Sequence, residues 1–503
     1  MMKRYFCSSF RRLNSKTHFE AVYANLLKHE CFKPLVGKVP TSYSQLDPYE
    51  LSQFVNESVA QQSLSSEQAV SIHNKMIEEL SKYEYGISTV HTKKLEQIGG
   101  KLSEKSLLEI IKNNPSRVYD SWELLKKFPR ELWVDDLLLA AVKNTISKKT
   151  YEENGKLMLP LNSLAQCIIL LHNIDHKQNI KKDLLDALID HILEGKISYA
   201  LQPLLQYRSS SLEPFINRID ELTPYQIYQL YKNFPLDLLK AEKELFLKIV
   251  ETLGKFQNII VSQEEIKAND GLKKCLEELD EFPVFNDLSH SEDLSQDYLH
   301  LREYISENKL DKKDLKLALI IMRIEGVHKG NLERVLELYH SYLLSYDNKA
   351  SQLMFEVLLS FASQSFKKSN LAILECSQAF ISTENYESDI VNTIRVLMLA
   401  NSKFQIEKSL ELYNTNIESF VNKDEGSLAS SLLTESLIMA YLVNQDLNFA
   451  RVIFEGAIRE KILSSSTVIK NLKALFKSYG DAVEKGNVED VMQERILRIF
   501  ETI

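Results

Sequence analysis

A short apolar pattern recurs along the C-terminal part of the chain, and its spacing limits the folds that this sequence can adopt. The clearest copy places apolar side chains at Leu332, Val335, Leu336 and Tyr339. Copies begin at residues 332, 371, 406, 447 and 488, which lie 39, 35, 41 and 41 residues apart. Apolar residues at this spacing occupy one face of an α-helix. Another apolar helix precedes each copy, so each repeat is predicted to be a hairpin of two helices.

Hairpins of this length cannot bury their apolar faces alone, and they stack on their neighbours. The N-terminal half shows its own echo, because residues 121–129 align with residues 227–235 and both segments end in Phe-Pro. The offset of 106 residues is close to three repeats of about 35. The predicted fold is therefore all-α, an α-solenoid of helical hairpin repeats in two arrays joined by an acidic linker.

Glycine and proline are scarce, with 14 and 11 in 503 residues, and no proline follows Pro283. This favours helices joined by short turns. Acidity is concentrated in residues 251–310, which hold 14 acidic and 6 basic residues. The predicted organisation is a transit peptide (1–19), a polar N-terminal arm (20–66), N-terminal helical repeats (67–255), an acidic linker (256–310) and C-terminal repeats (311–503).

The first 19 residues carry five basic side chains and no carboxylate, since the first acidic residue is Glu20. Phe6, Phe10 and Leu13 add an apolar stripe, and the segment is too polar for a secretory signal. These properties are typical of a mitochondrial transit peptide, with cleavage expected after Phe6 or near Leu13. The alternative is a disordered basic tail.

Net charge bears on nucleic-acid binding, because a phosphate backbone favours a basic surface. Removing the five N-terminal cations from 61 leaves 56 basic residues against 70 acidic ones, a balance of −14. A local basic groove remains compatible with this composition, whereas a generally basic protein is excluded. The RNA-contacting candidates are basic side chains on predicted helices, each of which has an ordinary solvated helix face as its alternative. They are Lys126, Lys127, Arg130, Lys312, Lys313, Lys316, Lys367 and Lys368.

No motif indicates an enzyme, a metal centre or a cofactor. His172 and His176 have the spacing of zinc ligands on one helix face, with Asp190 and His191 further on. The glutamate that would follow the first histidine in a zinc protease is absent, so a surface pair is the preferred interpretation. The five cysteines are widely scattered, and no apolar run has the length of a membrane span. We expect no catalysis, no cofactor and no transmembrane segment.

Residues 434–464 resemble a pentatricopeptide repeat, with an apolar first helix, a short polar turn and a second helix carrying Leu447, Ala450 and Phe454. Residues 325–344 and 404–419 resemble the second half of the same motif. The chain departs from that family in its 41-residue period, its missing loop glycine and its acidity. The resemblance is to degenerate members of fungal mitochondria.

This resemblance implies a mitochondrial factor that binds single-stranded organellar RNA and supports transcript stability, processing or translation. It also implies a matrix location, beside the mitoribosome or peripheral to the inner membrane. The alternative function is a protein-binding solenoid that assembles or tethers a mitoribosomal or respiratory complex, and the acidic composition suits this alternative better.

Overall fold

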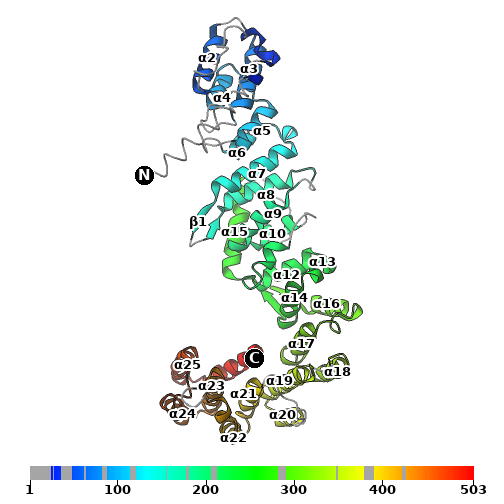
Figure 1. Cartoon of the computed structure of the whole chain (residues 1–503), viewed down its shortest axis with the longest axis vertical. Coiled ribbons are helices and arrows are strands. Elements are labelled where there is room, and N and C mark those ends of the chain that lie inside the picture. The colour runs from blue at the N-terminus through cyan, green and yellow to red at the C-terminus, as the bar shows by residue number, and fades with distance from the viewer. Residues whose placement is uncertain are drawn as a thin grey trace. The chain divides into compact units, whose positions relative to one another are not determined.

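The computed structural model describes residues 24–26, 28–35, 48–61, 64–81, 88–113, 120–153, 156–176, 180–205, 212–280, 291–346, 349–378, 390–421 and 426–503. The predicted transit peptide lies outside these residues. The described chain is predominantly α-helical (Figure 1). It forms two compact units: an N-terminal unit of residues 1–235 and 260–290, and a C-terminal unit of residues 236–259 and 291–503.

The N-terminal unit is built of short helices and one antiparallel hairpin, in which Tyr151 pairs with Met158. Its elements are η1 (Glu30–Leu35), α2 (Pro48–Gln61), α3 (Ser66–Leu80), α4 (Ser88–Gln97), α5 (Glu104–Asn113), α6 (Ser121–Leu125), η2 (Arg130–Leu132), α7 (Asp135–Lys149), β1 (Tyr151–Glu153), β2 (Lys156–Met158), α8 (Leu161–His172), α9 (Lys182–Glu194), η4 (Ser198–Ala200), α10 (Leu201–Leu205), α11 (Glu213–Ile216), α12 (Pro224–Asn233) and α15 (Gln263–Glu278).

The predicted echo between residues 121–129 and 227–235 has a structural counterpart. Helices α6 and α12 are both followed by Phe-Pro and then by a short helix, η2 in one case and α13 (Leu236–Ala241) in the other. Phe234, which precedes the second proline, is extended with φ −110° and ψ 143°. A residue before proline is driven out of the helical region by contact with the ring. Helix α12 therefore ends directly before Phe234, whereas α6 ends at Leu125, three residues before Phe128.

The C-terminal unit contains the predicted hairpins, and the five predicted start positions coincide with the first residues of five helices. These second helices are α18 (Leu332–Leu343), α20 (Leu371–Gln378), α22 (Ile406–Asn416), α24 (Leu447–Arg459) and α26 (Val488–Thr502). The first helices of the hairpins are α17 (Leu315–Arg323) with the π-helical turn η5 (Ile324–His328), α19 (Ala350–Lys368), α21 (Ile390–Asn401), α23 (Leu428–Val443) and α25 (Ser466–Lys485). The prediction of an all-α fold of helical hairpin repeats is confirmed.

The rest of this unit precedes the hairpins or separates them. Its elements are α13, α14 (Lys243–Lys255), most of β3 (Asn258–Ile260), β4 (Ser291–Asp293), α16 (Ser295–Glu307) and the short η7 (Ile417–Phe420).

The acidic linker expected over residues 256–310 differs from the structure. The chain passes between the two units after residues 235, 259 and 290, so no single linker joins them. Helix α15 lies in the middle of the expected linker, yet it buries Leu272 and Leu276 and packs against α8 in the N-terminal unit. Its Glu265 is buried and accepts hydrogen bonds from the hydroxyls of Ser198 (3.0 Å) and Thr223 (2.9 Å). One acidic residue of this stretch, Glu265, therefore has a structural role in the N-terminal unit.

The π-helical turn η5 brings the backbone of one hairpin into close contact with the next. A Cβ atom built on Gly326 would lie 2.3 Å from the Ser360 Cβ of α19 and 2.9 Å from the Val335 Cγ2. We expect Gly326→Ala to lower the free energy of unfolding by about 3 kcal/mol, because the Ser360 Cβ is bonded to the α19 backbone and cannot rotate away. Urea unfolding followed by circular dichroism measures this.

Gly480, in the middle of α25, provides the matched control because a Cβ atom there would have no neighbour within 4 Å. Gly480→Ala is expected to raise stability by about 0.4–1 kcal/mol, since alanine restricts the unfolded chain more than glycine does. Equal effects of the two substitutions would contradict the close approach at Gly326.

Candidate partner-binding surface

The first helices of successive hairpins lie side by side in the C-terminal unit, with α19 against α21, α21 against α23 and α23 against α25 (Figure 1). The last helix, α26, lies against α25, α23 and α19. We call the side of α19, α23 and α25 that carries α26 the inner face. A row of stacked helices with such a face is the surface that helical-repeat proteins use for binding.

An apolar stripe holds α26 on the inner face. Met492, Ile496 and Phe500 are buried and lie four residues apart, on one side of the helix. The Phe500 ring meets the edge of the Phe366 ring of α19, with 6.0 Å between the ring centres and 73° between the planes. The aromatic contact therefore joins the fifth hairpin to the second.

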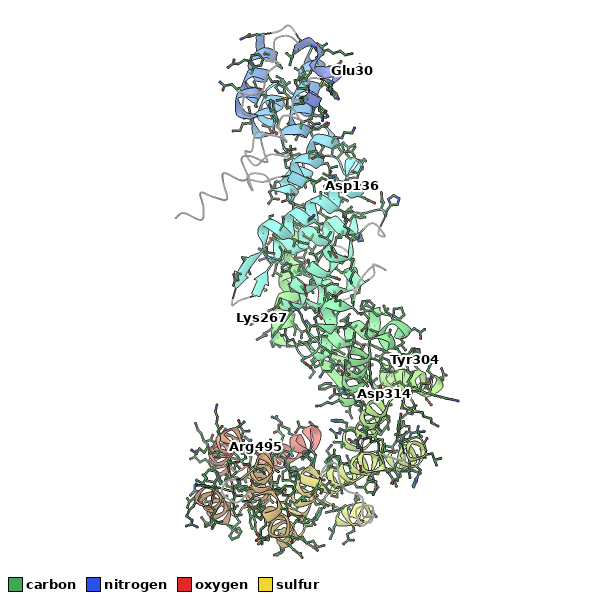
Figure 2. All side chains as sticks on the ribbon, viewed as in Figure 1. Glu30, Asp136, Lys267, Tyr304, Asp314 and Arg495 are labelled. Carbon is green, nitrogen blue, oxygen red and sulfur yellow. The ribbon has the colours of Figure 1, made fainter. Side chains whose placement is uncertain are left out.

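A groove of about 450 Å³ lies beside α26, with walls from α23, α25 and α26. The lining includes apolar side chains such as Met439 and Leu475 as well as charged ones, among them Arg495 on α26 (Figure 2). The lining is Glu435, Met439, Asn471, Ala474, Leu475, Val491, Glu494, Arg495, Arg498 and Ile499. A lining that mixes apolar and both kinds of charged side chain suits a peptide surface better than a phosphate backbone.

The carboxylate of Glu435 is tied to the neighbouring hairpin. Arg395 on α21 lies 3.6 Å from it and donates a hydrogen bond from Nε to the Ser436 hydroxyl at 3.1 Å. Burial raises the pKa of Glu435, whereas Arg395 acts in the opposite direction. This pair couples α21 to α23 at the groove wall.

The other end of the inner face is basic. His328, at the end of η5, has its pKa lowered to about 4 by burial and then by the surrounding cations Lys255, Lys367, Arg323 and Lys329. The carboxylate that α26 brings to this cluster is Glu501, whose Oε1 lies 4.0 Å from His328 Nδ1. The end of α26 thus places a negative charge where cations converge.

Lys367, one of the predicted RNA contacts, has a structural role. Its amino group donates a 2.7 Å hydrogen bond to the Val327 carbonyl of the preceding hairpin, and burial lowers its pKa. The same relation recurs in the next repeats, where Lys403 Nζ donates to the Phe366 carbonyl (3.4 Å) and Asn444 Nδ2 to the Ser402 carbonyl. At the ends of α19, α21 and α23, a side chain therefore donates to a backbone carbonyl at the end of the preceding first helix.

The other predicted RNA contacts are divided between the two units. In the N-terminal unit, Lys126 pairs with Glu123 (2.9 Å), Lys127 lies 4.0 Å from Glu96, and Arg130 lies over the Trp133 ring. In the C-terminal unit, Lys316 pairs with Glu244 (2.7 Å), and exposed side chains remain at Lys312, Lys313 and Lys368. RNA binding by these residues stays a prediction.

The histidines with zinc-like spacing separate in the structure. His172 is the last residue of α8, while His176 lies beyond the helix and contacts Asp135 across 3.0 Å. His191 is buried within α9. Among the described residues, no three His, Cys, Asp or Glu side chains are grouped closely enough to bind a metal ion.

No pattern in the sequence singles out the residues that shape the inner face, namely Arg395, Glu435, His328 and Glu501. The four-residue spacing of Met492, Ile496 and Phe500 does predict one more amphipathic helix at the end of the chain. Periodicity gives the side of a helix that is buried, but it does not identify which other helices receive it.

Known proteins match this chain over nearly its whole length. Four domain families match it in order: the MRX12 N-terminal domain (13–113), middle domain (124–297), second TPR-like domain (313–386) and C-terminal domain (414–503). MIOREX complex component 12 of Saccharomyces cerevisiae is 34% identical over 513 residues, covering 98% of this chain and 97% of the yeast protein. No solved structure is significantly similar.

The TPR-like description covers α17 to α20, and the pentatricopeptide assignment is not confirmed. Within the described part of the chain, no helix has the length and apolar character needed to cross a lipid bilayer. The identity to the yeast protein extends through both units. The chain therefore belongs to the MRX12 family of helical-repeat proteins.

Proposed function

We propose that this protein binds other proteins through its helical repeats and acts as an assembly or tethering component of a mitochondrial gene-expression complex that includes the mitoribosome. Two considerations support the cellular role: the basic, acid-free N-terminal segment and the yeast relative named as a component of the MIOREX complex. The proposed location is the matrix, peripheral to the inner membrane.

The observation that carries the proposal is the groove on the inner face. Its lining includes Met439 and the arginines Arg495 and Arg498, and methionine and arginine are among the residue types enriched at protein interfaces. Helical-repeat arrays present such faces to extended or helical protein segments. The role of Lys367 as a carbonyl cap further reduces the support for a phosphate-binding face.

The test is recovery of the tagged full chain from mitochondria, with and without ribonuclease, followed by mass spectrometry. We expect mitoribosomal proteins to be recovered in both conditions. Reversing two charges on the groove rim, with Glu494→Lys and Arg498→Glu, is expected to lower that recovery about tenfold, which corresponds to about 1.4 kcal/mol of binding free energy.

The matched control reverses another exposed pair of the same unit, Arg334 and Glu337, which are 2.7 Å apart on α18. Recovery should be unchanged by Arg334→Glu with Glu337→Arg. Loss of the co-purified proteins on ribonuclease treatment alone would instead support the second candidate function, binding of RNA. The observation that favours this candidate is the convergence of cations around His328.

A further inference from the structure

Three lysines form a row on the solvent side of α25, directly beside the groove. Lys470, Lys473 and Lys477 are all exposed, and their spacing of three and four residues places them on one face of the helix. Lys470 lies four residues before Ala474 and Lys477 lies three residues after it, so both are its neighbours on the helix surface. Because Ala474 lines the groove, this lysine row borders the groove on its α25 side.

The positive charge of the lysine row is not neutralised within the part of the chain that the structure describes. None of the three amino groups has a carboxylate within 4.0 Å among those residues. The acidic residues of the groove lining are already paired, since Glu494 forms an ion pair with Arg498. The second one, Glu435, lies 3.6 Å from Arg395. The border of the groove therefore carries an excess of positive charge, which complements an acidic partner.

This excess is limited to the middle of α25. The next charged side chains along the helix are the exposed acids Asp481 and Glu484. The lysine row therefore lies beside the part of the groove that Asn471 and Ala474 line. The amide of Asn471 is exposed at this edge and has both a donor and an acceptor for the backbone of a bound peptide.

The floor beside the lysine row is apolar. Met439 of α23, Leu475 of α25 and Ile499 of α26 contribute to it, so three helices shape one depression. Its volume of about 450 Å³ is large enough to receive apolar side chains of a partner segment. Apolar contact and positive charge are therefore offered side by side.

The chemistry of the groove favours protein over RNA as the acidic partner. Proteins bind single-stranded RNA by stacking its bases on aromatic rings and arginine planes. The described lining of the groove contains no aromatic side chain. The aromatic residues of α25 point into the fold, where Phe476 meets the Phe454 ring of α24 with 5.4 Å between the ring centres and Tyr479 is buried.

We propose that the groove binds an acidic segment of a partner protein, in which large apolar side chains alternate with glutamate or aspartate. The apolar side chains enter the floor, and the carboxylates face the lysine row. Helix α26 stays in place, because it forms one wall of the site. This assignment rests on the proposed protein-binding function and adds the chemistry of the bound segment.

The direct test uses the full chain and a short fluorescent peptide in which leucine and phenylalanine alternate with glutamate. A second peptide has lysine in place of every glutamate. Fluorescence anisotropy is expected to show at least about tenfold tighter binding of the acidic peptide. Its affinity should fall about fivefold between about 0.05 and 0.3 M salt, because the lysine row is exposed to solvent. Equal binding of the two peptides, or binding of neither, would overturn the proposal.

Reversing the charge of the lysine row tests its part in binding. The triple variant Lys470→Glu, Lys473→Glu and Lys477→Glu is expected to bind the acidic peptide at least about 30-fold more weakly. All three side chains are exposed, so the substitutions leave the apolar core intact.

The matched control reverses three other exposed lysines of the same unit, with Lys312→Glu, Lys313→Glu and Lys408→Glu. The change in net charge is the same, and the affinity for the acidic peptide should change less than about twofold. An equal loss in both triple variants would mean that overall charge holds the peptide, and the assignment to the groove would be wrong.

Filling the groove tests the apolar floor without changing any charge. Ala474→Trp places a large ring in the lining and should weaken binding of the acidic peptide about tenfold. Ala372→Trp, at an exposed position of α20, is the control and should bind normally. Normal binding by Ala474→Trp would show that the lysines act without the groove, contrary to the proposal.

The mitochondrial recovery experiment separates this assignment from the proposed function. Recovery of mitoribosomal proteins that is equal for the unaltered chain and the lysine-row variant leaves the proposed function standing and rejects the acidic segment. Absence of these proteins from both, with lysine-dependent binding of the acidic peptide, rejects the proposed function and retains the site. Tighter lysine-dependent binding of a uridine oligonucleotide than of the acidic peptide would make RNA the ligand and overturn the proposal.

Discussion

Replacing Arg323 with methionine is expected to lower the free energy of unfolding of the C-terminal unit by about 3–5 kcal/mol. Arg323, the last residue of α17, donates two hydrogen bonds to the Glu356 carboxylate of α19, at 3.0 Å from Nε and 2.7 Å from the second nitrogen. Burial raises the pKa of Glu356, and the guanidinium opposes this shift. Without Arg323, a buried carboxylate loses the charge that compensates for its burial.

The change is measured by urea unfolding with far-ultraviolet circular dichroism. Tryptophan fluorescence supplies an internal reference, because the two tryptophans of the chain, Trp122 and Trp133, both lie in the N-terminal unit. Arg334→Met is the control, since its pair with Glu337 is exposed on both sides and should contribute about 0–1 kcal/mol.

A double variant separates the buried charge from lost packing. Arg323→Met combined with Glu356→Met removes both charges and should recover most of the stability, because an apolar pair of similar volume carries no burial penalty for charge. If the double variant is as unstable as Arg323→Met alone, packing rather than charge explains the loss.

The copies of the repeat pattern begin at the first residues of the second helices in the C-terminal unit, because each of these helices carries its own apolar signal. The spacing of apolar residues is local information: Ile406, Leu447 and Val488 each begin both a copy of the sequence pattern and an observed helix. The turns between first and second helices are short, so the boundary is set by a few polar residues. Local patterns were therefore sufficient for this part of the fold.

The positions of α15 and of the Lys367 side chain depend on contacts with residues that are distant in the sequence. Glu265 reads as one more acid in an acidic stretch, and its buried position follows from hydroxyls 67 and 42 residues away, on Ser198 and Thr223. Likewise Lys367 reads as a solvated cation, although its acceptor carbonyl lies 40 residues earlier at Val327. Charge in a single sequence does not reveal which groups compensate for it.

Acidification is expected to destabilise the N-terminal unit, with a loss of about 4 kcal/mol between pH 7.5 and pH 5 from two buried histidines. His91 and His73 face each other with 3.0 Å between their Nδ1 atoms, and the Ser52 hydroxyl lies 2.7 Å from His91 Nε2. Burial is the main cause that lowers the pKa of His73 to about 4 and that of His91 to about 3. Lys94 adds to the effect on His73, and His73 adds to the effect on His91. The pair is therefore neutral in the folded state at pH 5.

The sign follows from proton binding. An unfolded histidine has a pKa of about 6.5, so below that pH the unfolded chain takes up protons that the folded chain does not. Each histidine then favours unfolding by about 1.4 kcal/mol per pH unit, or about 2 kcal/mol at pH 5. The stability that the neutral pair retains above pH 6.5 is lost progressively as the pH falls toward 4.

Urea unfolding curves read by tryptophan fluorescence at several pH values measure this slope in the N-terminal unit. The double variant His73→Leu with His91→Asn is less stable at pH 7.5 but should lose about 4 kcal/mol less on acidification, because neither replacement titrates. His176→Gln is the matched control, since its exposed ring lies in the same unit and should leave the slope in place. The double variant cannot bind a proton at either position, so its free energy of unfolding should depend less steeply on pH. If the double variant and the unaltered chain show equal slopes, groups other than His73 and His91 cause the loss of stability in acid.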